Sequence, residues 1–129
     1  MLNFEELDSK IEGIIENVTV DISHIHHAFS EPFEFRDLTI PELFSVDAMA
    51  LTLRKQFPAI GGSLAQNIVV MGQSCVKPDL GGAIEFFAKM ALSDKVPIKA
   101  AFSYLLNAFV QGFPHILDAG KAAEEKKSD

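Results

Sequence analysis

The sequence has a single cysteine, no tryptophan, one tyrosine and few basic residues among its 129 positions. One cysteine excludes an intramolecular disulfide, which suits a reducing cytosol and disfavours a disulfide-stabilised secreted scaffold. Long apolar runs are also lacking, because the longest window, residues 59–72, contains Ser63 and Gln66 and is too short to span a bilayer. Residues 1–6 have no basic n-region or apolar h-region, so we expect no signal peptide.

Basic residues are outnumbered, and the imbalance lies in the first part of the chain. There are 11 basic and 18 acidic residues, which give a net charge of −7. Residues 1–48 carry eleven acidic side chains against two basic ones, whereas residues 49–129 carry seven against nine. Nucleic-acid binding requires clustered Lys and Arg, and single-strand binding adds aromatic platforms. The sequence supplies neither, so we expect no nucleic-acid partner, and the acidic half disfavours an anionic membrane.

Length and composition indicate one domain. A chain of 129 residues with 48% apolar and 22% charged residues can form a core without a metal or disulfide. We expect a single domain over residues 1–119, followed by a flexible charged tail over residues 120–129. Within the domain, residues 1–38 are predicted to form an N-terminal helix plus a β-hairpin region, and residues 39–119 a helical bundle.

The hydrophobic period changes along the first third of the chain. Residues 4–17 repeat their apolar positions with the spacing of a helix. Residues 18–22 and 33–36 alternate apolar and polar side chains, which predicts two short strands. Residues 24–32 between them are predicted to form a long hairpin turn.

The rest of the chain has helical periodicity. Thr39 and Glu42 form a capping box in front of a helix that runs to about Gln56. Its apolar residues form one main stripe along the helix, and further apolar residues beside the stripe make it wider. The stripe is Leu43, Val46, Ala50, Leu53 and Phe57, and the widening residues are Phe44, Ala48 and Leu51.

Three further helices are predicted from caps and spacing. Ser63 caps a helix over residues 64–72, which a loop over residues 73–78 follows, and Asp79 caps a helix over residues 80–92. Asp94 caps a helix over 97–111, which should return antiparallel because its link is short, and Pro114 starts a last short helix through Leu117. The predicted class is mainly α with a small N-terminal β-hairpin (α+β), with a bundle of about five to six helices.

The histidines are the most visible candidates for metal chemistry. His24, His26 and His27 lie within four residues. If this segment is extended, His24 and His26 share a face, and if it is helical, His24 and His27 do. Either arrangement gives two ligands, and Cys75 or His115 would have to complete a tetrahedral zinc site. We interpret the segment as a polar, exposed loop and expect no metal.

Catalytic motifs are missing as well. Asp47 and Glu85 each stand alone on an apolar element, where an exposed edge position is the favoured interpretation over a buried acid. The glycine turns at residues 61–63 and 79–82 match neither a P-loop nor a dinucleotide fingerprint. Cys75 has no neighbouring His and is interpreted as an inert small residue. We therefore expect no enzyme and no cofactor.

Phenylalanine is abundant, with eleven residues, five of which crowd the last third of the chain. Helices 80–92 and 97–111 are apolar nearly all round, and a small bundle cannot cover both faces of both. Surplus apolar surface indicates a partner or an oligomer interface. The candidate partner-binding residues are Phe86, Phe102, Phe109, Phe113 and Ile116.

The order of these segments resembles the phage tail assembly chaperones, or pre-tape-measure proteins. Residues 35–43 read FRDLTIPEL, similar to the x-R-x-L-[ST] strand that precedes the first helix of that family. Residues 88–94 end a later helix, and residues 96–98 form an apolar-Pro-apolar start of the next one. The resemblance covers roughly residues 33–115, and the N-terminal helix and the His-rich loop have no counterpart in it.

The resemblance implies a non-enzymatic chaperone of virion assembly. Such a protein binds the tape-measure protein, keeps its long apolar helices in solution and helps recruit the tail-tube protein. It would act in the host cytoplasm and be absent from the mature virion. A homo-oligomer is also expected. The alternatives are a small helical homo-oligomerisation or interaction module of other function and, with less weight, a metal-binding protein built on the three histidines.

The resemblance also makes a prediction about the gene. The family often makes a second, longer product by frameshifting near the end of the first reading frame, and Lys126-Lys127 can be encoded by A-rich slippery codons. We expect an A-rich run at these codons and an overlapping −1 frame that continues downstream. The nucleotide sequence checks this, and an immediate stop in the −1 frame would contradict it.

Overall fold

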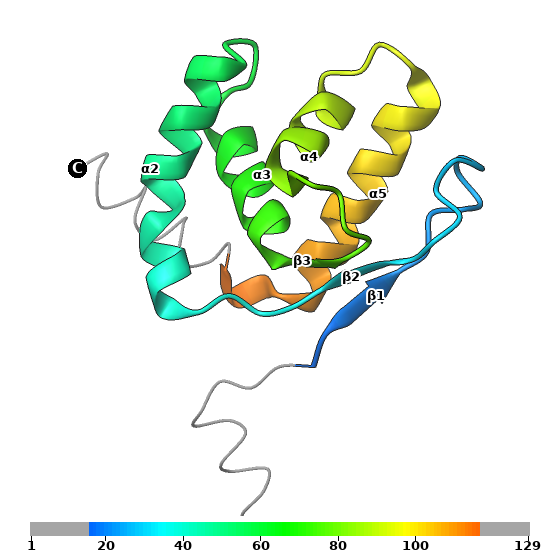
Figure 1. Ribbon diagram of the computed structural model, residues 1–129, viewed down its shortest axis with the longest axis horizontal. Coiled ribbons are helices and arrows are strands. Elements are labelled where there is room, and N and C mark those ends of the chain that lie inside the picture. Colours follow the sequence, from blue (N-terminus) through cyan, green and yellow to red (C-terminus); the bar gives the residue numbers. More distant parts are fainter. Residues whose placement is uncertain (1–15, 117–129) are drawn as a thin grey trace, which may run out of the picture.

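The computed structural model describes residues 16–116. The elements, in chain order, are β1 (Val18–Val20), β2 (Phe33–Phe35), α2 (Ile40–Gln56), α3 (Gly62–Ser74), β3 (Cys75–Lys77), α4 (Ala83–Ala91) and α5 (Val96–Gly112). Residues 114–116 add a last helical turn. The predicted α+β class is confirmed: the chain is mainly helical, with a small antiparallel sheet on its N-terminal side (Figure 1). The predicted helix over residues 4–17 and the tail over residues 120–129 lie outside the described residues.

The sheet has three strands in the order β1-β2-β3. The predicted hairpin is confirmed, with Val18 opposite Phe35 and Val20 opposite Phe33. The prediction of a loop over residues 73–78 is wrong, because β3 pairs antiparallel with β2 there, with a register shift beside Phe35. Three residues carry too little alternation to indicate a strand, and β3 pairs with a strand that α2 and α3 separate from it in sequence.

Helix α2 begins where the sequence predicts. Thr39 is the N-cap in extended conformation, and its backbone N–H donates to Glu42 Oε1 at 2.9 Å. The Glu42 backbone N–H donates in return to Thr39 Oγ1 at 3.4 Å, so the capping box is closed in both directions. Pro41 is tolerated in the first turn because amides there have no partner within the helix. The buried side of α2 consists of Val46, Ala50 and Leu53.

The predicted caps of α3 and α4 are wrong. Gly61, rather than Ser63, is the N-cap of α3, and Gly82, rather than Asp79, is that of α4. The Asp79 carboxylate accepts from the Gly81 backbone N–H at 3.0 Å, so it closes a turn before the helix instead of capping it. Gly81 has φ +74°, a conformation that favours glycine.

The predicted cap of α5 is also wrong. Lys95 is the N-cap and makes no side-chain capping bond, while Asp94 lies one residue earlier. Ser93 Oγ accepts from the Lys95 backbone N–H at 3.1 Å and shapes the short link after α4. Because the link is short, α4 and α5 pack side by side, as expected (Figure 1).

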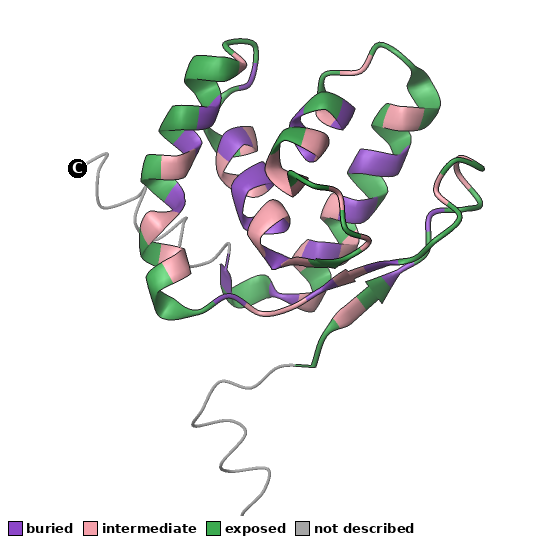
Figure 2. Ribbon diagram, viewed as in Figure 1, coloured by how far each residue is buried: buried purple, intermediate pink, exposed green. Residues whose placement is uncertain are grey.

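Phenylalanine rings join the sheet to the helices. Phe35 of β2 meets Phe109 of α5 edge-on, with ring centroids 5.5 Å apart. Phe87 of α4 lies 6.1 Å from Phe33 and 6.2 Å from Phe35. Figure 2 shows that the buried positions of the helices face inward, toward one another and toward the sheet. The β-hairpin therefore covers apolar surface of α4 and α5 that a helical bundle alone would expose.

Gly72 sets the separation between α3 and α4. A Cβ atom at this position would lie 2.3 Å from Ile84 Cγ1, 2.8 Å from its Cα and 2.9 Å from its backbone N. Two of these three atoms are backbone, so a side chain could be accommodated only by moving the start of α4. At Gly62 the corresponding Cβ would meet only a flexible arginine end at 3.8 Å.

Replacing Gly72 with Ala is expected to lower the free energy of unfolding by about 1–3 kcal/mol, the usual cost of overpacking. Gly62→Ala is the matched control, since it adds the same methyl group at the first position of the same helix without a clash; we expect a change within about 0.5 kcal/mol. Urea unfolding of the two variants measures both values. Equal stability of the two would show that α3 and α4 do not depend on this close approach.

Candidate partner-binding groove and the polar junction beside it

The N-terminal histidines do not form a metal site among the described residues. His24 packs edge-on against the Tyr104 ring, with centroids 5.2 Å apart, and the rings of His26 and His27 stack at 4.8 Å. His26 Nδ1 accepts from the Ala28 backbone N–H at 3.0 Å. Between residues 16 and 116, no group of three or more His, Cys, Asp or Glu side chains could hold a metal ion. His26 and His27 instead make local contacts within the hairpin connection, and His24 packs it against α5.

The other two candidate ligands are separated from this loop. His115 Nε2 lies 2.8 Å from Asp37 Oδ1 and joins the last helical turn to the segment before α2. Cys75 is half-buried in β3, and burial raises the pKa of its thiol to about 11. A thiol with that pKa holds almost no thiolate at neutral pH, so Cys75 is a poor nucleophile.

The two isolated carboxylates are exposed, as favoured from the sequence. Asp47 lies on the outside of α2 and accepts from Gln66 Nε2 of α3 at 2.9 Å. Glu85 lies in the first turn of α4, where the helix dipole favours a negative charge.

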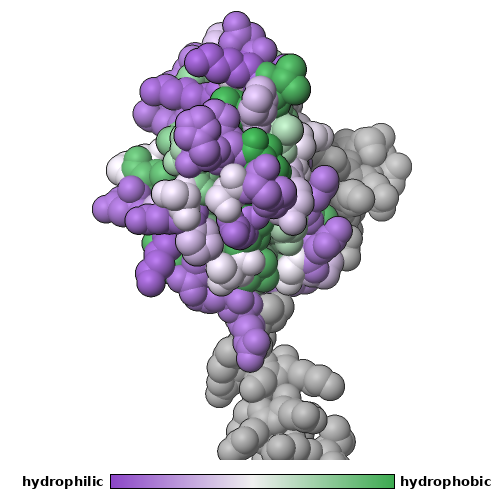
Figure 3. All heavy atoms as spheres, turned by 90° about the vertical axis from the view of Figure 1, so that its right-hand side faces the viewer, coloured by the Kyte–Doolittle hydropathy of each residue, from purple (hydrophilic) through white to green (hydrophobic). Residues whose placement is uncertain are grey.

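The candidate partner-binding residues lie mainly in the core. Phe102, Phe109, Phe113 and Ile116 are buried, so they are not available on the surface, and Phe86 is half-buried. These phenylalanines are buried in part because the β-hairpin packs over α4 and α5. Figure 3 shows the side of the molecule beyond α5, where apolar atoms occur in small patches between hydrophilic side chains. A partner surface therefore has to be sought elsewhere.

An open, mostly apolar groove lies between α2, the end of α3 and the start of α4. Its volume is about 590 Å³. The walls carry small or flexible side chains, and the lining residues are Ala48, Met49, Thr52, Leu53, Gln56, Gly72, Gln73, Gly82, Ala83, Ile84 and Glu85. Gly72 brings the start of α4 against α3, and Gly82 leaves the groove without a side chain at that point. In the sequence, the groove is therefore indicated by Gly72 and Gly82 and not by the phenylalanines, none of which lines it.

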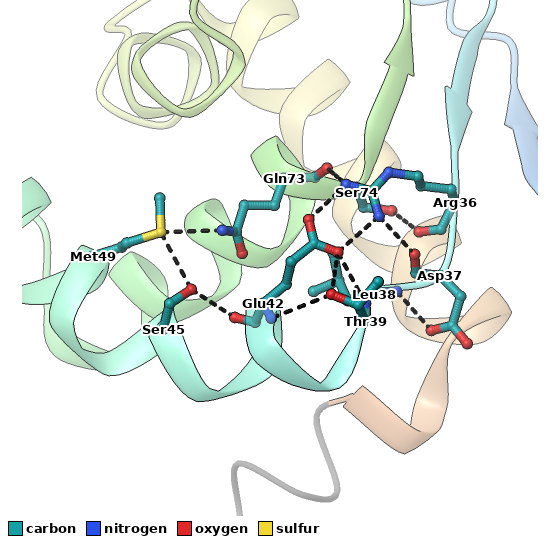
Figure 4. A network of polar contacts seen from close by, with 9 residues as sticks. All are labelled: Arg36, Asp37, Leu38, Thr39, Glu42, Ser45, Met49, Gln73 and Ser74. Atoms are coloured by element: carbon teal, nitrogen blue, oxygen red, sulfur yellow. Dashed lines mark hydrogen bonds and ion pairs between the residues drawn. The ribbon is translucent and has the colours of Figure 1, made fainter. Parts of the chain in front are cut away.

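A polar junction beside the groove fixes how α2 leaves the sheet (Figure 4). Arg36, just after β2, donates from Nη1 and Nη2 to the two carboxylate oxygens of Glu42, at 2.8 and 2.6 Å. The same guanidinium donates to the backbone carbonyls of Asp37 at 3.0 Å and Gln73 at 3.1 Å. Arg36 thus ties the strand end, the first turn of α2 and the last turn of α3 together.

The junction continues through the end of α3. The Arg36 backbone N–H donates to the Ser74 carbonyl at 2.8 Å, and the buried Ser74 hydroxyl donates to the Arg36 carbonyl. Gln73 Nε2 lies 3.1 Å from Met49 Sδ on the opposite groove wall, and Gln73 Oε1 is buried without a hydrogen-bond partner among the described residues. This oxygen has almost no accessible surface, so it is an unpaired buried acceptor and not an open part of the groove wall.

Arg36 and Glu42 each stabilise the charged form of the other. Hydrogen bonds from Arg36, with further ones from Thr39, lower the pKa of the Glu42 carboxyl from 4.5 to about 2. The same pairing raises the pKa of the Arg36 guanidinium. Both side chains are therefore ionised throughout the neutral and mildly acidic range, and the bidentate geometry gives the pair a fixed orientation.

Comparisons of the chain with models of protein families, with curated protein sequences and with solved structures found no match. None of the helices between residues 16 and 116 is both long and apolar enough to cross a membrane. The function must therefore be argued from the groove, the junction and the exposed surface.

Replacing Glu42 with Gln is expected to lower the free energy of unfolding by about 1–2 kcal/mol at pH 7, because it removes a charged hydrogen-bond acceptor and weakens the helix cap. The pKa of Glu42 is lowered on folding, so its contribution is complete above pH 4.5 and is lost as the pH falls toward 2. The difference between the two proteins should shrink over that interval. Urea titrations at several pH values measure it.

Glu31→Gln is the control for this series. Glu31 is exposed in the β1–β2 connection, so its variant should track the wild type at every pH. A stability gap for Glu42→Gln that stays constant between pH 5 and pH 2 would contradict the proposed role of the ion pair.

Proposed function

We propose that this chain is a non-enzymatic assembly chaperone that binds an apolar helical segment of a partner protein in the groove between α2, α3 and α4. In line with the resemblance to phage tail assembly chaperones, the proposed partner is a tape-measure-like protein with long apolar helices, and the tail-tube protein is the second component recruited. The proposed site of action is the host cytoplasm, with the protein absent from the mature virion.

The observation that carries the proposal is the chemistry and size of the groove. Its 590 Å³ fall within the range of sites that enclose several apolar groups of a ligand. Two of its walls are helices, α2 and α4, and an apolar helix laid between helices is a recurrent mode of recognition, with anchors at i, i+3, i+4 and i+7. Met49 on the wall is flexible and polarisable, which lets one groove accept different apolar side chains.

The polar junction supports the same function by keeping the groove open. Arg36 joins α2 to the last turn of α3 by way of Glu42 and the Gln73 carbonyl. With α2 held in this way, its apolar wall cannot collapse onto α4 when no partner is bound. A binding site that is already formed loses less conformational entropy on binding.

The functional groups around the groove favour binding over catalysis. Glu85 is the one titratable side chain in its lining, and the other polar members are hydroxyl and amide groups. Acid–base or nucleophilic catalysis requires a second group placed to activate the first.

Placing a cation in the groove should block binding without unfolding the chain. Thr52 lines the groove and is exposed on α2, so Thr52→Arg adds bulk and charge where the partner helix would lie. The experiment co-expresses the chain with the long coiled-coil protein encoded next to it and measures the soluble fraction of that partner. The wild type should keep the partner soluble, and Thr52→Arg should lower co-purification about tenfold, because a desolvated charge opposes docking.

Ser103→Arg is the matched control, since Ser103 is also an exposed hydroxyl residue on a helix, but on α5 and away from the groove. It should behave as the wild type. A partner that is no more soluble with the wild-type chain than without it would overturn the chaperone function. Equal co-purification by the two arginine variants would overturn the groove as its site.

A further inference from the structure

We propose that residues 4–15 of this chain form an amphipathic helix that occupies the groove between α2, α3 and α4 in the free protein. The helix runs antiparallel to α2, with Ile15 at the Gln73 end of the groove. This contact does not rest on the proposed chaperone function, although its consequence for partner binding does.

Residues 4–15 carry the pattern of a helix with one apolar side. Leu7, Ile11, Ile14 and Ile15 follow one another at spacings of four, three and one, which places them on the same side of a helix. The first three stand at i, i+4 and i+7, the positions by which an amphipathic helix is anchored in an apolar groove. A helix of twelve residues is marginal in water by itself, so this one depends on the surface against which it packs.

The described part of the chain begins close to one end of the groove. Val18 of β1 pairs with Phe35 of β2, which in turn pairs with Cys75 of β3. Neighbouring strands lie about 4.8 Å apart, so Val18 is about 10 Å from Cys75, which follows the groove-lining Gln73 by two positions. The step from Ile15 to Val18 spans about 10 Å when extended, which is enough to bring Ile15 to this end of the groove.

The direction and the length of the segment also fit the groove. Strand β1 is antiparallel to β2, so the residues that precede it continue past Phe35 toward the polar junction. Helix α2 begins at that junction and runs away from it (Figure 1), so a helix whose C-terminal end lies there is antiparallel to α2. From Leu7 to Ile15 a helix rises about 12 Å, the same rise that separates Ala48 from Gln56 in the α2 wall.

Charge favours the same orientation. The start of the segment carries Glu5, Glu6 and Asp8. In the antiparallel orientation these acidic side chains lie at the far end of the groove, where Lys55 of α2 and Lys89 of α4 are exposed. Each of the two lysines follows a groove-lining residue by one turn of its helix. Acidic residues in a first turn also stabilise the helix through its dipole.

Thiol labelling of the full chain tests whether the groove is covered. Thr52 lines the groove and is exposed in the described fold, so Thr52→Cys reports on any further cover. With residues 4–15 bound, Thr52→Cys should react with a maleimide about tenfold more slowly than Ser103→Cys, which is exposed on α5 away from the groove. Cys75 adds little background, because burial raises the pKa of its thiol to about 11.

Removal of the anchors gives the decisive comparison. The variant Leu7→Ser/Ile11→Ser/Ile14→Ser should accelerate labelling of Thr52→Cys about tenfold, because the segment loses the side chains that hold it in the groove. Slow labelling of Cys75 in the same samples shows that the fold is intact. Equal labelling of Thr52→Cys with and without the anchors would overturn the proposal.

The polar side of the segment supplies the matched control. Ser9 and Glu12 lie opposite the anchors on a helix, so Thr52→Cys should stay protected in Ser9→Ala/Glu12→Ala, and fast labelling there would contradict an amphipathic contact. Dilution of the wild-type segment should leave the rate unchanged. Protection that is lost on dilution would place the segment of a second chain in the groove and overturn the intrachain contact.

Charge reversal tests the orientation without removing apolar surface. Lys55→Glu/Lys89→Glu places acidic side chains opposite the acidic start of the segment and should accelerate labelling of Thr52→Cys about threefold. Adding Glu5→Lys/Glu6→Lys restores opposite charges and should return the rate to its initial value. A rate that ignores the first change, or that the second does not restore, would show the antiparallel orientation to be wrong.

For the proposed function, the segment competes with the partner. A groove that is open about one tenth of the time binds its partner about tenfold more weakly, so removal of the anchors should strengthen binding of the neighbouring coiled-coil protein about tenfold. Unchanged binding would overturn this competition. If that protein binds neither form while the labelling results hold, the proposed function fails and the intrachain contact stands.

Discussion

The bidentate pair between Arg36 and Glu42 is the constraint on which the arrangement of this protein depends. One guanidinium meets the end of β2, the first turn of α2 and the last turn of α3, and it adds to the hydrogen bonds that join Arg36 to Ser74 at the end of α3. An arginine can do this because its five donors lie in one rigid plane. The x-R-x-L-[ST] pattern of residues 35–39 thus has a structural explanation: the arginine forms the junction, Leu38 is buried beneath it, and Thr39 caps the helix.

The groove follows from this junction and from Gly72. Arg36 holds α2 against the end of α3, and Gly72 lets α4 approach α3 on the other side. The space between α2 and α4 is therefore set by two short-range contacts, one ionic and one steric, neither of which lies in the middle of the groove. A partner helix can then bind to walls that are already in place, and substitutions at the junction should alter binding through groove geometry rather than through lost contacts.

Local chemistry was predictable from the sequence, and non-local pairing was not. The capping box and the two alternating strands depend on neighbouring residues, and both are confirmed. Strand β3 depends on pairing with β2, which is distant in sequence. The predicted cap of α4 failed because the Asp79 carboxylate accepts a hydrogen bond within the preceding turn and is not available to the helix. The phenylalanines show the same limit. Periodicity places Phe102 and Phe109 on an apolar helix face, but it does not show that the hairpin packs against that face and buries both side chains.

Helix α2 shows why this distinction matters for function. From the sequence, Phe44, Ala48 and Leu51 widen the stripe that contains Val46, Ala50 and Leu53. In the folded chain the two sets separate, since the second is buried against the rest of the molecule and Phe44 is almost fully exposed. An isolated monomer gains no stability from an exposed phenylalanine on a helix, because alanine has the higher helix propensity. The residue becomes favourable only when something covers it, so α2 carries surplus apolar surface next to the groove, in addition to the exposed Leu92 and Val96 in the last third of the chain.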